Sequence, residues 1–353
     1  MKIATVIGAR PEIIKMSRLV PLLDKNFDHT FIFTGQHYSK AMVDIFFEDL
    51  GLRQPDFSLN TMSSDYHVLM ESILGKLKEV NPDYVVVYGD TNSTLATAIC
   101  AKKLNKKLIH IEAGLRSFDK EMPEEMNRIL TDHVSDFLFT PTEYTKRLLK
   151  NEGIIKNVFV VGNPVIDTVV SCSSKVDGSS ILNDLGLEEG EYFLLTLHRC
   201  ETVDNPEKIK KLIGMLASID RKIVFPIHPR TEKALKEFNL TLPENVIKTG
   251  PLGYFDFLRL LKSSFLVMTD SGGVQEEAVA LRVPCLTLRN FTERMEIVEL
   301  GVSFLVGIEP DMIRQHIDYI INNNVREKLR QIENPYGVGK TSESIIEILK
   351  QRL

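Results

Sequence analysis

Acidic side chains gather in residues 110–128, HIEAGLRSFDKEMPEEMNR, and another acid ends the apolar run YVVVYGD a little upstream. Asp90 and Glu112 each follow a segment with the composition of a buried strand, and Glu124 follows Pro123 at an expected helix start. Carboxylates that lie close together in a closed site often have raised pKa values, which suits proton exchange with a substrate. These residues therefore predict acid–base chemistry. For Glu124 and Glu125 the alternative is that they only complement the helix dipole.

A second feature is a turn that is typical of phosphate binding. In TDSGGVQEEA, residues 269–278, an apolar strand runs into Ser271-Gly272-Gly273, and a helix is expected from about Val274. Glycines let the backbone approach a ligand, and the first helical N–H groups favour an anion. Glu277, one turn into the helix, is placed to accept hydrogen bonds from two ribose hydroxyls. The alternative is a glycine turn with a serine cap and no ligand.

The first half of the chain has a matching turn in GARPEIIK, residues 8–15. Pro11 suits the first position of a helix, which puts Arg10 at the turn and Lys15 about one turn further along. Arginine presents a rigid fork of donors to phosphate oxygens. The alternative is a surface ion pair between Arg10 and Glu12.

Two histidines, His198 in TLHR and His228 in IHPR, follow expected strands, and each is followed closely by arginine. We expect them near the ligand, although a lone histidine is more often structural or solvated. The histidines and acids lack the H-x-x-x-H and D-x-D spacings, so we predict no metal site. Neither G-x-G-x-x-G nor a P-loop sequence occurs, which argues against dinucleotide and ATP binding.

The elements that must position these residues alternate along the whole chain. Short runs such as KIATVIG, HTFIFTG, DYVVVYGD, KLIHIEA and DFLFTPT are rich in β-branched and aromatic residues, and amphipathic stretches separate them. This alternation predicts an α/β protein with doubly wound parallel sheets. A chain of 353 residues suggests two domains. We expect Rossmann-like domains over 1–170 and 171–337, a linker at SSKVDGSS (173–180), and a terminal helix, 338–353, that packs back on the first domain. Ligands would bind in a cleft beyond the carboxyl ends of the strands.

Composition excludes several classes of protein. The net charge of −5 argues against a nucleic-acid binder. The four scattered cysteines are typical of reduced thiols in the cytoplasm. The start, MKIATVIGARPE, has no signal-peptide pattern, and no apolar run is as long as a membrane span. The sequence thus predicts a cytoplasmic protein that binds neither nucleic acid nor membrane.

A series of motifs, in order, resembles the non-hydrolysing UDP-N-acetylglucosamine 2-epimerases from residue 3 to about 307: GARPEIIK, TGQHYS, GDTNSTLA, HIEAGLRS, PEEMNR, VGNPVID, TLHRCE, HPRT, TDSGGVQEEA and TERME. The resemblance implies the glycosyltransferase-B fold, an active site in the cleft, a homodimer, and a reaction without NAD or metal. It also implies a role in polysaccharide biosynthesis. UDP leaves C1 as a proton is removed from C2, and UDP adds back to the 2-acetamidoglucal after reprotonation from the other face, giving UDP-N-acetylmannosamine.

The resemblance also assigns roles. Asp90, Glu112 and Glu124 match the catalytic carboxylates, without showing which removes the proton and which returns it. The diphosphate and active-site positions are matched by Arg10, Lys15, Arg128 and His198. The phosphate turn is matched by Ser271, Gly272 and Gly273. Glu277 matches the ribose ligand, and Phe257 matches the residue that contacts the uracil. From the sequence pattern alone, Phe257 would be a core residue.

The chain departs from the family at three places. Many members read HRREN where this chain has Cys200 in place of the second arginine and Thr202 in place of asparagine. The arginines of that segment, with glutamines after the QH motif, help bind a second, activating substrate molecule in those members. This chain has Cys200 and no further glutamine after Gln36-His37, so the resemblance does not extend to activation by these contacts. Met295 replaces a proline, which predicts a looser turn near the phosphates. Arg294 stands where epimerases of the 2,3-diacetamido glucuronate nucleotide usually have tryptophan, which favours the simpler substrate. That uronate epimerase, a hydrolysing relative, a glycosyltransferase and a catalytically silent UDP-sugar sensor remain alternatives.

Overall fold

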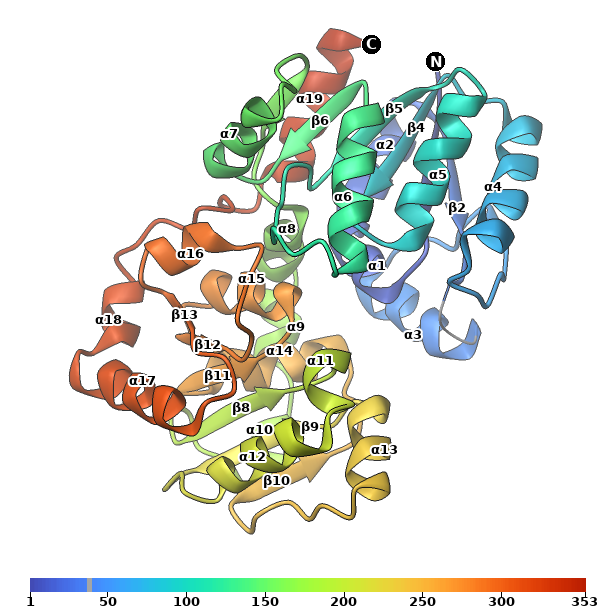
Figure 1. Cartoon of the computed structure of the whole chain (residues 1–353). Helices are drawn as coiled ribbons and strands as arrows, with labels where there is room; N and C mark the ends of the chain where they lie inside the picture. The colour runs from blue at the N-terminus through green and yellow to red at the C-terminus, as the bar shows by residue number, and fades with distance from the viewer. Residues whose placement is uncertain (37–39) are drawn as a thin grey trace. The chain divides into compact units, whose positions relative to one another are not determined.

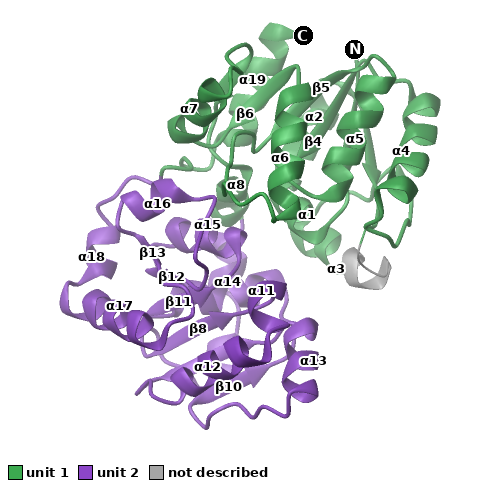
Figure 2. Cartoon of the chain, viewed as in Figure 1, with its two compact units in different colours: residues 1–171, 335–353 green, residues 172–334 purple. Residues whose placement is uncertain are grey.

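The computed structural model describes residues 1–36 and 40–353, without the side chains of residues 40–44. His37, Tyr38 and Ser39 of the TGQHYS motif lie outside the described residues. The chain forms two compact units (Figure 2). Unit 1 contains Met1–Ser171 and Pro335–Leu353, and unit 2 contains Cys172–Asn334.

Unit 1 is built on one parallel sheet in the order β3-β2-β1-β4-β5-β6-β7. The inner strands are buried on both faces, as their continuous apolar composition requires. The strands are β1 (Lys2–Ile7), β2 (Asp28–Phe33), β3 (Phe57–Ser58), β4 (Tyr84–Tyr88), β5 (Lys107–Ile111), β6 (Phe137–Thr140) and β7 (Val158–Val160).

Helices cover both faces of this sheet. The crossovers into β4, β5 and β6 all run in one direction along the sheet, and α4, α5 and α6 accordingly lie side by side on one face (Figure 1). The helix α19 contacts α2 and α8, so the C-terminal segment completes unit 1. The helices are α1 (Arg10–Met16), α2 (Leu19–Asn26), α3 (Lys40–Leu50), α4 (Tyr66–Val80), α5 (Asn92–Lys103), α6 (Pro123–Val134), α7 (Glu143–Asn151), α8 (Pro164–Ser171) and α19 (Thr341–Arg352).

Unit 2 repeats the architecture with the parallel order β10-β9-β8-β11-β12-β13. Its strands are β8 (Tyr192–Thr196), β9 (Lys222–Pro226), β10 (Val246–Thr249), β11 (Leu266–Thr269), β12 (Cys285–Thr287) and β13 (Ser303–Leu305). Its helices are α9 (Ser173–Asp177), α10 (Ile181–Asp184), α11 (Cys200–Val203), α12 (Pro206–Leu216), α13 (Pro229–Glu237), α14 (Tyr254–Ser263), α15 (Gly272–Ala280), α16 (Met295–Glu299), α17 (Pro310–Asn322) and α18 (Val325–Leu329). The predicted fold class of two doubly wound parallel-sheet units is confirmed.

The structure corrects some local predictions. The segment 173–180 is not an open linker: it contains α9, which packs on α14 because Val176 is buried there. The helix α16 begins only at Met295, after a turn in which the Thr292 hydroxyl accepts a hydrogen bond from Arg294 N. The helix expected from Val274 begins earlier, at Gly272. The strands β3 and β10 were not predicted. No helix in the described part of the chain is both long and apolar enough to cross a membrane.

Candidate active site

Three neighbouring strands of unit 1 bring predicted site residues to one edge of the sheet. The order β1-β4-β5 places the turn after β1, residues 8–10, beside Asp90 after β4 and Glu112 after β5. Ends of parallel strands at one sheet edge are the usual place for a ligand site in this class. Sequence spacing did not show this adjacency, because β2 and β3 intervene along the chain.

Glu112 is the centre of a buried hydrogen-bond cluster. Its Oε2 accepts from Lys15 Nζ at 2.6 Å, from the Tyr88 hydroxyl at 2.5 Å and from Asn163 Nδ2 at 2.8 Å. Its backbone has a φ of 68°, in the left-handed region that a glutamate rarely adopts. Such backbone strain persists where the surroundings hold a residue firmly, and it is common at functional sites. Lys15 and Glu112, which were predicted as site residues, are thus brought together.

Tyr88 and Asn163 belong to this cluster and were not predicted. The Tyr88 hydroxyl lies 3.0 Å from Asn163 Oδ1, so each of them contacts both Glu112 and the other. Tyr88 ends an apolar strand and looks like a core residue in the sequence. Asn163 lies in the VGNPVID motif, which was the only signal for it.

A second cluster holds Asp90. Arg128 Nη1 donates to Asp90 Oδ2 at 2.5 Å, and Arg128 Nη2 donates to Glu125 Oε2 at 2.7 Å. Glu125 is 1% exposed and also accepts hydrogen bonds from the backbone N–H groups of Ser117 and Phe118. Glu125 therefore holds Arg128 and a loop in place, and the interpretation that it merely complements the helix dipole is wrong.

Glu124 and Arg10 are the other predicted site residues of unit 1. Glu124 is half-buried at the start of α6. The Arg10 guanidinium lies 5.0 Å from the centre of the Phe46 ring, a cation–π contact. The alternative of a surface pair between Arg10 and Glu12 is wrong, because Glu12 is 3% exposed and its carboxyl accepts hydrogen bonds from Gly8 N and Ala9 N. Burial, the largest cause, raises the pKa of Glu12 to about 7, and the two N–H donors oppose it.

In unit 2, Asp270 organises the loop that carries His198. The buried Asp270 follows β11, and its Oδ2 accepts from His198 N and Arg199 N, each at 2.8 Å. The His198 ring reaches back so that Nε2 lies 3.6 Å from Asp270 Oδ1. His228 lies with its ring centre 5.7 Å from that of His198 and caps α13, where its Nδ1 accepts from Arg230 N. Asp270 was part of the motif, but its role was not predicted.

The Ser-Gly-Gly turn opens α15, with Ser271 as the N-cap. A methyl group on Gly272 would lie 2.9 Å from Arg294 Nη1, so this glycine lets a guanidinium pack against the turn. Arg294 is 5% exposed and pairs with Glu276 at 2.8 Å and with Glu293 at 3.2 Å. Gly272, in the turn predicted for phosphate binding, thus packs on a buried group of ion pairs. Sequence reasoning did not find this group.

Glu277 and Phe257 lie on adjoining helices of unit 2. The Tyr254 hydroxyl donates to Glu277 Oε1 at 3.0 Å, which orients the carboxylate. Burial, and then the neighbouring Glu277, raise the pKa of Tyr254 well above its usual value, so Tyr254 stays a donor. Phe257 lies three residues after Tyr254 on α14, half-buried rather than in the core.

The residues that depart from the family pattern have ordinary structural positions. Cys200 is exposed at the start of α11, and Thr202 is 4% exposed within it. Met295 is the first residue of α16, a position that proline also suits. Within the described residues, no three His, Cys, Asp or Glu side chains form a group that could hold a metal ion.

Two Rossmann-like units with a phosphate-type turn in one and clustered carboxylates in the other define a nucleotide-sugar enzyme of the glycosyltransferase-B type. The family model for UDP-N-acetylglucosamine 2-epimerase matches residues 22–350. The chain therefore belongs to the UDP-N-acetylglucosamine 2-epimerase family.

Individual relatives agree with this assignment. A UDP-N-acetylglucosamine 2-epimerase of Methanocaldococcus jannaschii is 45% identical, over 99% of both chains. The crystal structure of the enzyme from that organism, in complex with UDP-GlcNAc and UDP, matches with a TM-score of 0.91 and 44% identity, over 99% of this chain and 100% of the other. A UDP-2,3-diacetamido-2,3-dideoxy-D-glucuronate 2-epimerase of Pseudomonas aeruginosa is 39% identical, over 99% of both chains.

Proposed function

We propose that this protein interconverts UDP-N-acetylglucosamine and UDP-N-acetylmannosamine by epimerisation at C2. Full-length similarity to an epimerase whose crystal structure holds UDP-GlcNAc and UDP supports the substrate. The Glu112 cluster carries the proposal, because proton transfer at carbon needs a carboxylate whose position and hydrogen bonds are set in advance.

The reaction is a balanced elimination and addition. A carboxylate removes the C2 proton while the C1–O bond breaks and UDP leaves with its electron pair, giving the 2-acetamidoglucal. A carboxylic acid then protonates C2 from the opposite face, and a UDP oxygen forms the new C1–O bond. Asp90, Glu112 and Glu124 are the groups proposed for these two proton transfers. No oxidant, reductant or metal enters this balance.

The other residues bind the nucleotide in this proposal. Lys15 and Arg128 form ion pairs with Glu112 and Asp90. In this proposal their positive charges also stabilise the negative charge that develops on the diphosphate as it leaves. Arg10 and His198 act on the diphosphate. The N–H groups of the Ser271–Gly273 turn bind phosphate, Glu277 binds the ribose, and Phe257 stacks on the uracil. Unit 2 is thus the proposed UDP-binding domain, and unit 1 supplies the acid–base groups.

The 2,3-diacetamido glucuronate nucleotide is the alternative substrate, since an epimerase for it is 39% identical. Arg294 favours the simpler sugar, because relatives with the uronate specificity usually have tryptophan there. A hydrolysing reaction that releases free N-acetylmannosamine is the third possibility, and it shares the elimination step.

Proton NMR in D2O separates these outcomes. The protein is incubated with UDP-N-acetylglucosamine without NAD or added metal. We expect UDP-N-acetylmannosamine with deuterium at C2. Free N-acetylmannosamine with UDP would assign the hydrolysing reaction. No turnover of this substrate, but turnover of the diacetamido uronate nucleotide, would assign the alternative.

Single substitutions test the carboxylates. D90N, E112Q and E124Q should each lower kcat by about 10²–10⁴-fold, the usual contribution of a positioned acid or base. Glu121→Gln is the matched control, because Glu121 is an exposed acid just before the same helix. Equal activity of E112Q and E121Q would contradict the role of Glu112.

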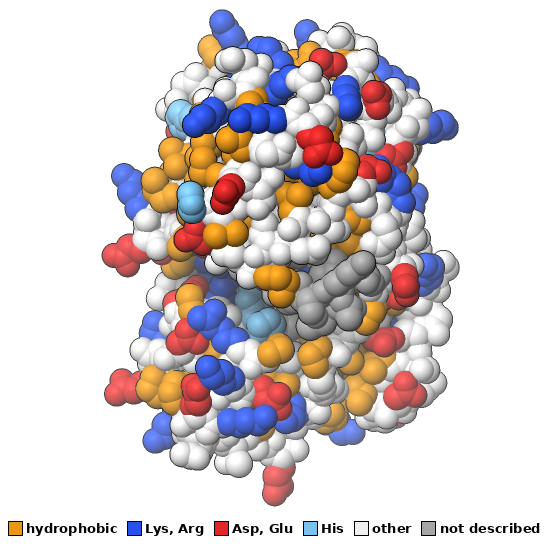
Figure 3. Space-filling view, turned by 90° about the vertical axis from the view of Figure 1, so that its right-hand side faces the viewer, with side chains coloured by type: hydrophobic (Ala, Val, Ile, Leu, Met, Phe, Trp, Pro, Cys, Tyr) orange, Lys and Arg blue, Asp and Glu red, His pale blue; other side chains and the backbone are white. Residues whose placement is uncertain are grey.

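We also propose that the protein is a homodimer that pairs through the outer face of α5 and α6. Met126, Leu130 and Val134 recur every four residues on α6 and are 41%, 43% and 36% exposed. The helix α5, which packs against α6, carries Ile99, which is 38% exposed. Figure 3 shows that hydrophobic side chains lie among charged ones on the face of the molecule that it draws. A two-fold axis across this face would make the contact self-complementary.

A charged substitution on this face tests the pairing. Sedimentation analysis should give a dimer for the natural chain and a monomer for L130E. A monomeric natural chain would overturn the pairing.

A further inference from the structure

Glu12 is a buried carboxyl group to which the proposed reaction gives no role. It is the third residue of α1 and joins two segments of the proposed site. Its Oε2 accepts from Gly8 N at 2.8 Å and from Ala9 N at 2.6 Å, in the turn that precedes Arg10. Its Oε1 lies 3.3 Å from the hydroxyl oxygens of both Thr91 and Thr94, at the start of α5. Asp90 immediately precedes Thr91, so one carboxyl holds the turn and the Asp90 segment together.

The protons around Oε1 can be counted. The Thr94 hydroxyl donates to the Tyr88 carbonyl oxygen at 2.7 Å, and a carbonyl cannot donate in return. The Thr91 and Thr94 hydroxyl oxygens also lie 3.0 Å apart. Only the Thr91 hydroxyl proton remains for the three oxygen–oxygen contacts among Thr91, Thr94 and Glu12, which measure 3.0–3.3 Å. A proton on Glu12 Oε1 would supply a second donor, to the Thr94 oxygen, while Oε2 keeps both N–H bonds.

Charges nearby also favour a neutral Glu12. In the described residues Glu12 has no ion pair. Asp90 faces it from the start of α5 and adds negative charge, while Arg128 of α6 is committed to Asp90.

The cations of α1 are also engaged. Lys15 pairs with Glu112, and Arg10 lies over Phe46 of α3. The remaining helix packed on α1 is α8, where the Asp167 carboxylate accepts from Thr341 N and Ser342 N. Together with burial, these surroundings agree with a Glu12 pKa of about 7.

We propose that Glu12 is a positioning residue that works in its protonated form, holding the turn at residues 8–10 and the Asp90 segment without adding a charge. This inference rests on the proposed function, in which that turn binds the diphosphate. When Glu12 loses its proton to solvent, its carboxylate becomes a second anion beside Asp90 and repels the diphosphate. UDP binding then weakens as pH rises above the pKa of Glu12.

NMR of the natural chain tests the proton directly and needs no catalytic activity. The amide signals of Gly8 and Ala9, and the side-chain ¹³C carboxyl signal that disappears in E12Q, are followed from pH 4 to 9. We expect all three to titrate together with a midpoint close to pH 7. A midpoint near 4.5, the ordinary value for a glutamate, would overturn the proposal. The two amide signals decide the point even if E12Q does not fold.

UDP affinity at each pH tests the consequence. We expect the dissociation constant of the natural chain to rise by up to tenfold per pH unit above the midpoint, and that of E12Q, which cannot ionise, not to show this rise. The ratio between the two proteins cancels the ionisation of UDP itself. Asp167→Asn is the matched control, since it also converts a buried acceptor of two backbone N–H groups to an amide, and it should behave like the natural chain.

The two proposals fail in distinguishable ways. If the natural chain binds no UDP and turns over no nucleotide sugar at any pH, the proposed function fails, and the NMR midpoint still decides whether Glu12 is protonated. If E12Q shows the same rise in dissociation constant as the natural chain, the positioning role is wrong while the proposed function stands.

Discussion

Glu112 of unit 1 has a backbone conformation that is unusual for a glutamate. Glu112 has a φ of 68°, which costs a non-glycine residue roughly 1–3 kcal/mol. Three donors converge on its Oε2, from Lys15, Tyr88 and Asn163, and hold it there. The position of the carboxylate is therefore decided by its partners rather than by its own backbone preference.

Glu12 should make stability depend on pH in the sense opposite to a paired carboxylate. Its folded pKa, about 7, lies above the ordinary 4.5, so the folded state binds more protons between these values. The free energy of unfolding should therefore fall as pH rises through this window, by up to roughly 3 kcal/mol. Urea unfolding of the natural chain and E12Q at pH 5 and pH 8 measures the difference. Between pH 5 and pH 8 the difference in the free energy of unfolding between the two proteins should change by a similar amount, in favour of E12Q. The same pH dependence in both proteins would contradict the raised pKa of Glu12.

Gly272 and Gly273 should respond differently to alanine. A methyl group at Gly272 would collide with the Arg294 guanidinium, whereas one at Gly273 meets nothing within 4 Å. G272A should destabilise the protein by about 1–3 kcal/mol, as overpacking usually does. G273A should leave the melting temperature unchanged or raise it, yet weaken UDP binding if the turn holds phosphate. Thermal melts with and without UDP distinguish these effects, and equal destabilisation by both would refute the steric account.

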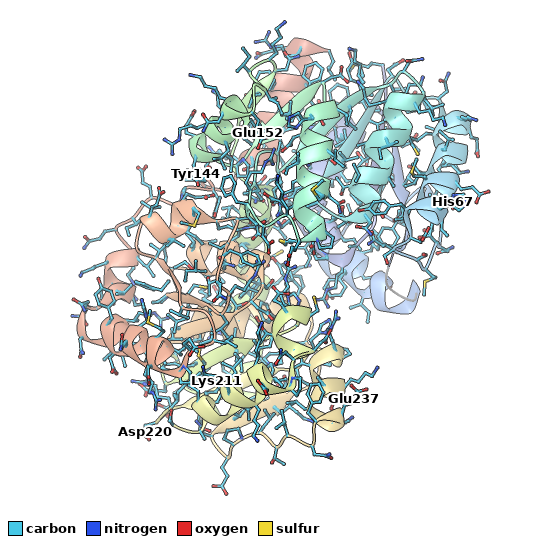
Figure 4. The ribbon with its side chains drawn as sticks, in the orientation of Figure 1. His67, Tyr144, Glu152, Lys211, Asp220 and Glu237 are labelled. Atoms are coloured by element: carbon cyan, nitrogen blue, oxygen red, sulfur yellow. The ribbon has the colours of Figure 1, made fainter. Side chains whose placement is uncertain are left out.

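At the scale of elements, a buried charge network joins β5, α6 and α7 beneath the proposed site. Asp132 accepts from His110 Nδ1 and Arg116 Nη1, both at 2.7 Å, and Arg116 also pairs with Glu152, labelled in Figure 4. His110 Nε2 lies 2.8 Å from the Gly89 carbonyl oxygen, next to Asp90. Burial alone would raise the pKa of Asp132, but His110 and Arg116 outweigh it and lower the pKa. The network fixes the strand end that carries Asp90.

Asp132→Asn should cost about 3–5 kcal/mol at pH 7, because it leaves a buried arginine without one of its anions. Since the Asp132 pKa is lowered, this stabilisation exists above the ordinary pKa of 3.8 and disappears as pH falls below it. Urea unfolding at pH 7 measures the loss. Asp204→Asn, which breaks the exposed pair with Arg230, is the control and should cost at most about 1 kcal/mol. Similar losses of stability in the two variants would show that the buried network stabilises the fold no more than an exposed ion pair does.

At the scale of the whole molecule, the last helix belongs to the first unit. The chain leaves unit 1 after Ser171, builds unit 2, and returns at Pro335 so that α19 packs on α2 and α8. Asp167 of α8 accepts from the first N–H groups of α19, at Thr341 and Ser342. Unit 1 is therefore complete only after the entire chain has been made.

Ile345→Ala should destabilise unit 1 selectively. Ile345 is fully buried in α19, and removing such a side chain costs about 2–5 kcal/mol. Hydrogen exchange should speed up in β1 and β4 but not in β8 and β11. Ile321→Ala is the control, because Ile321 is 40% exposed on α17. Faster exchange in both units would show that they unfold as one.

Much of this protein is determined by the sequence itself. Alternation of apolar and amphipathic segments determines the parallel α/β class, and the order of motifs determines the family, because both are local features of the chain. The glycine turn and the acids at strand ends are local as well, so they were predictable. Short elements such as β3 and α9 were not, since their formation depends on neighbours distant in sequence.

Tertiary structure decided which side chains meet. Lys15 and Glu112 are 97 residues apart, and Asn163 reaches Glu112 across 51 residues. These contacts exist because the sheet places β4 beside β1 and β5 beside β4, although β2 and β3 intervene in the chain. Burial also decides the properties of residues such as Glu12, which is a surface acid by type but is 3% exposed in the fold, where burial raises its pKa to about 7. Strand order and burial depend on all segments at once, so spacing along the chain could not determine them.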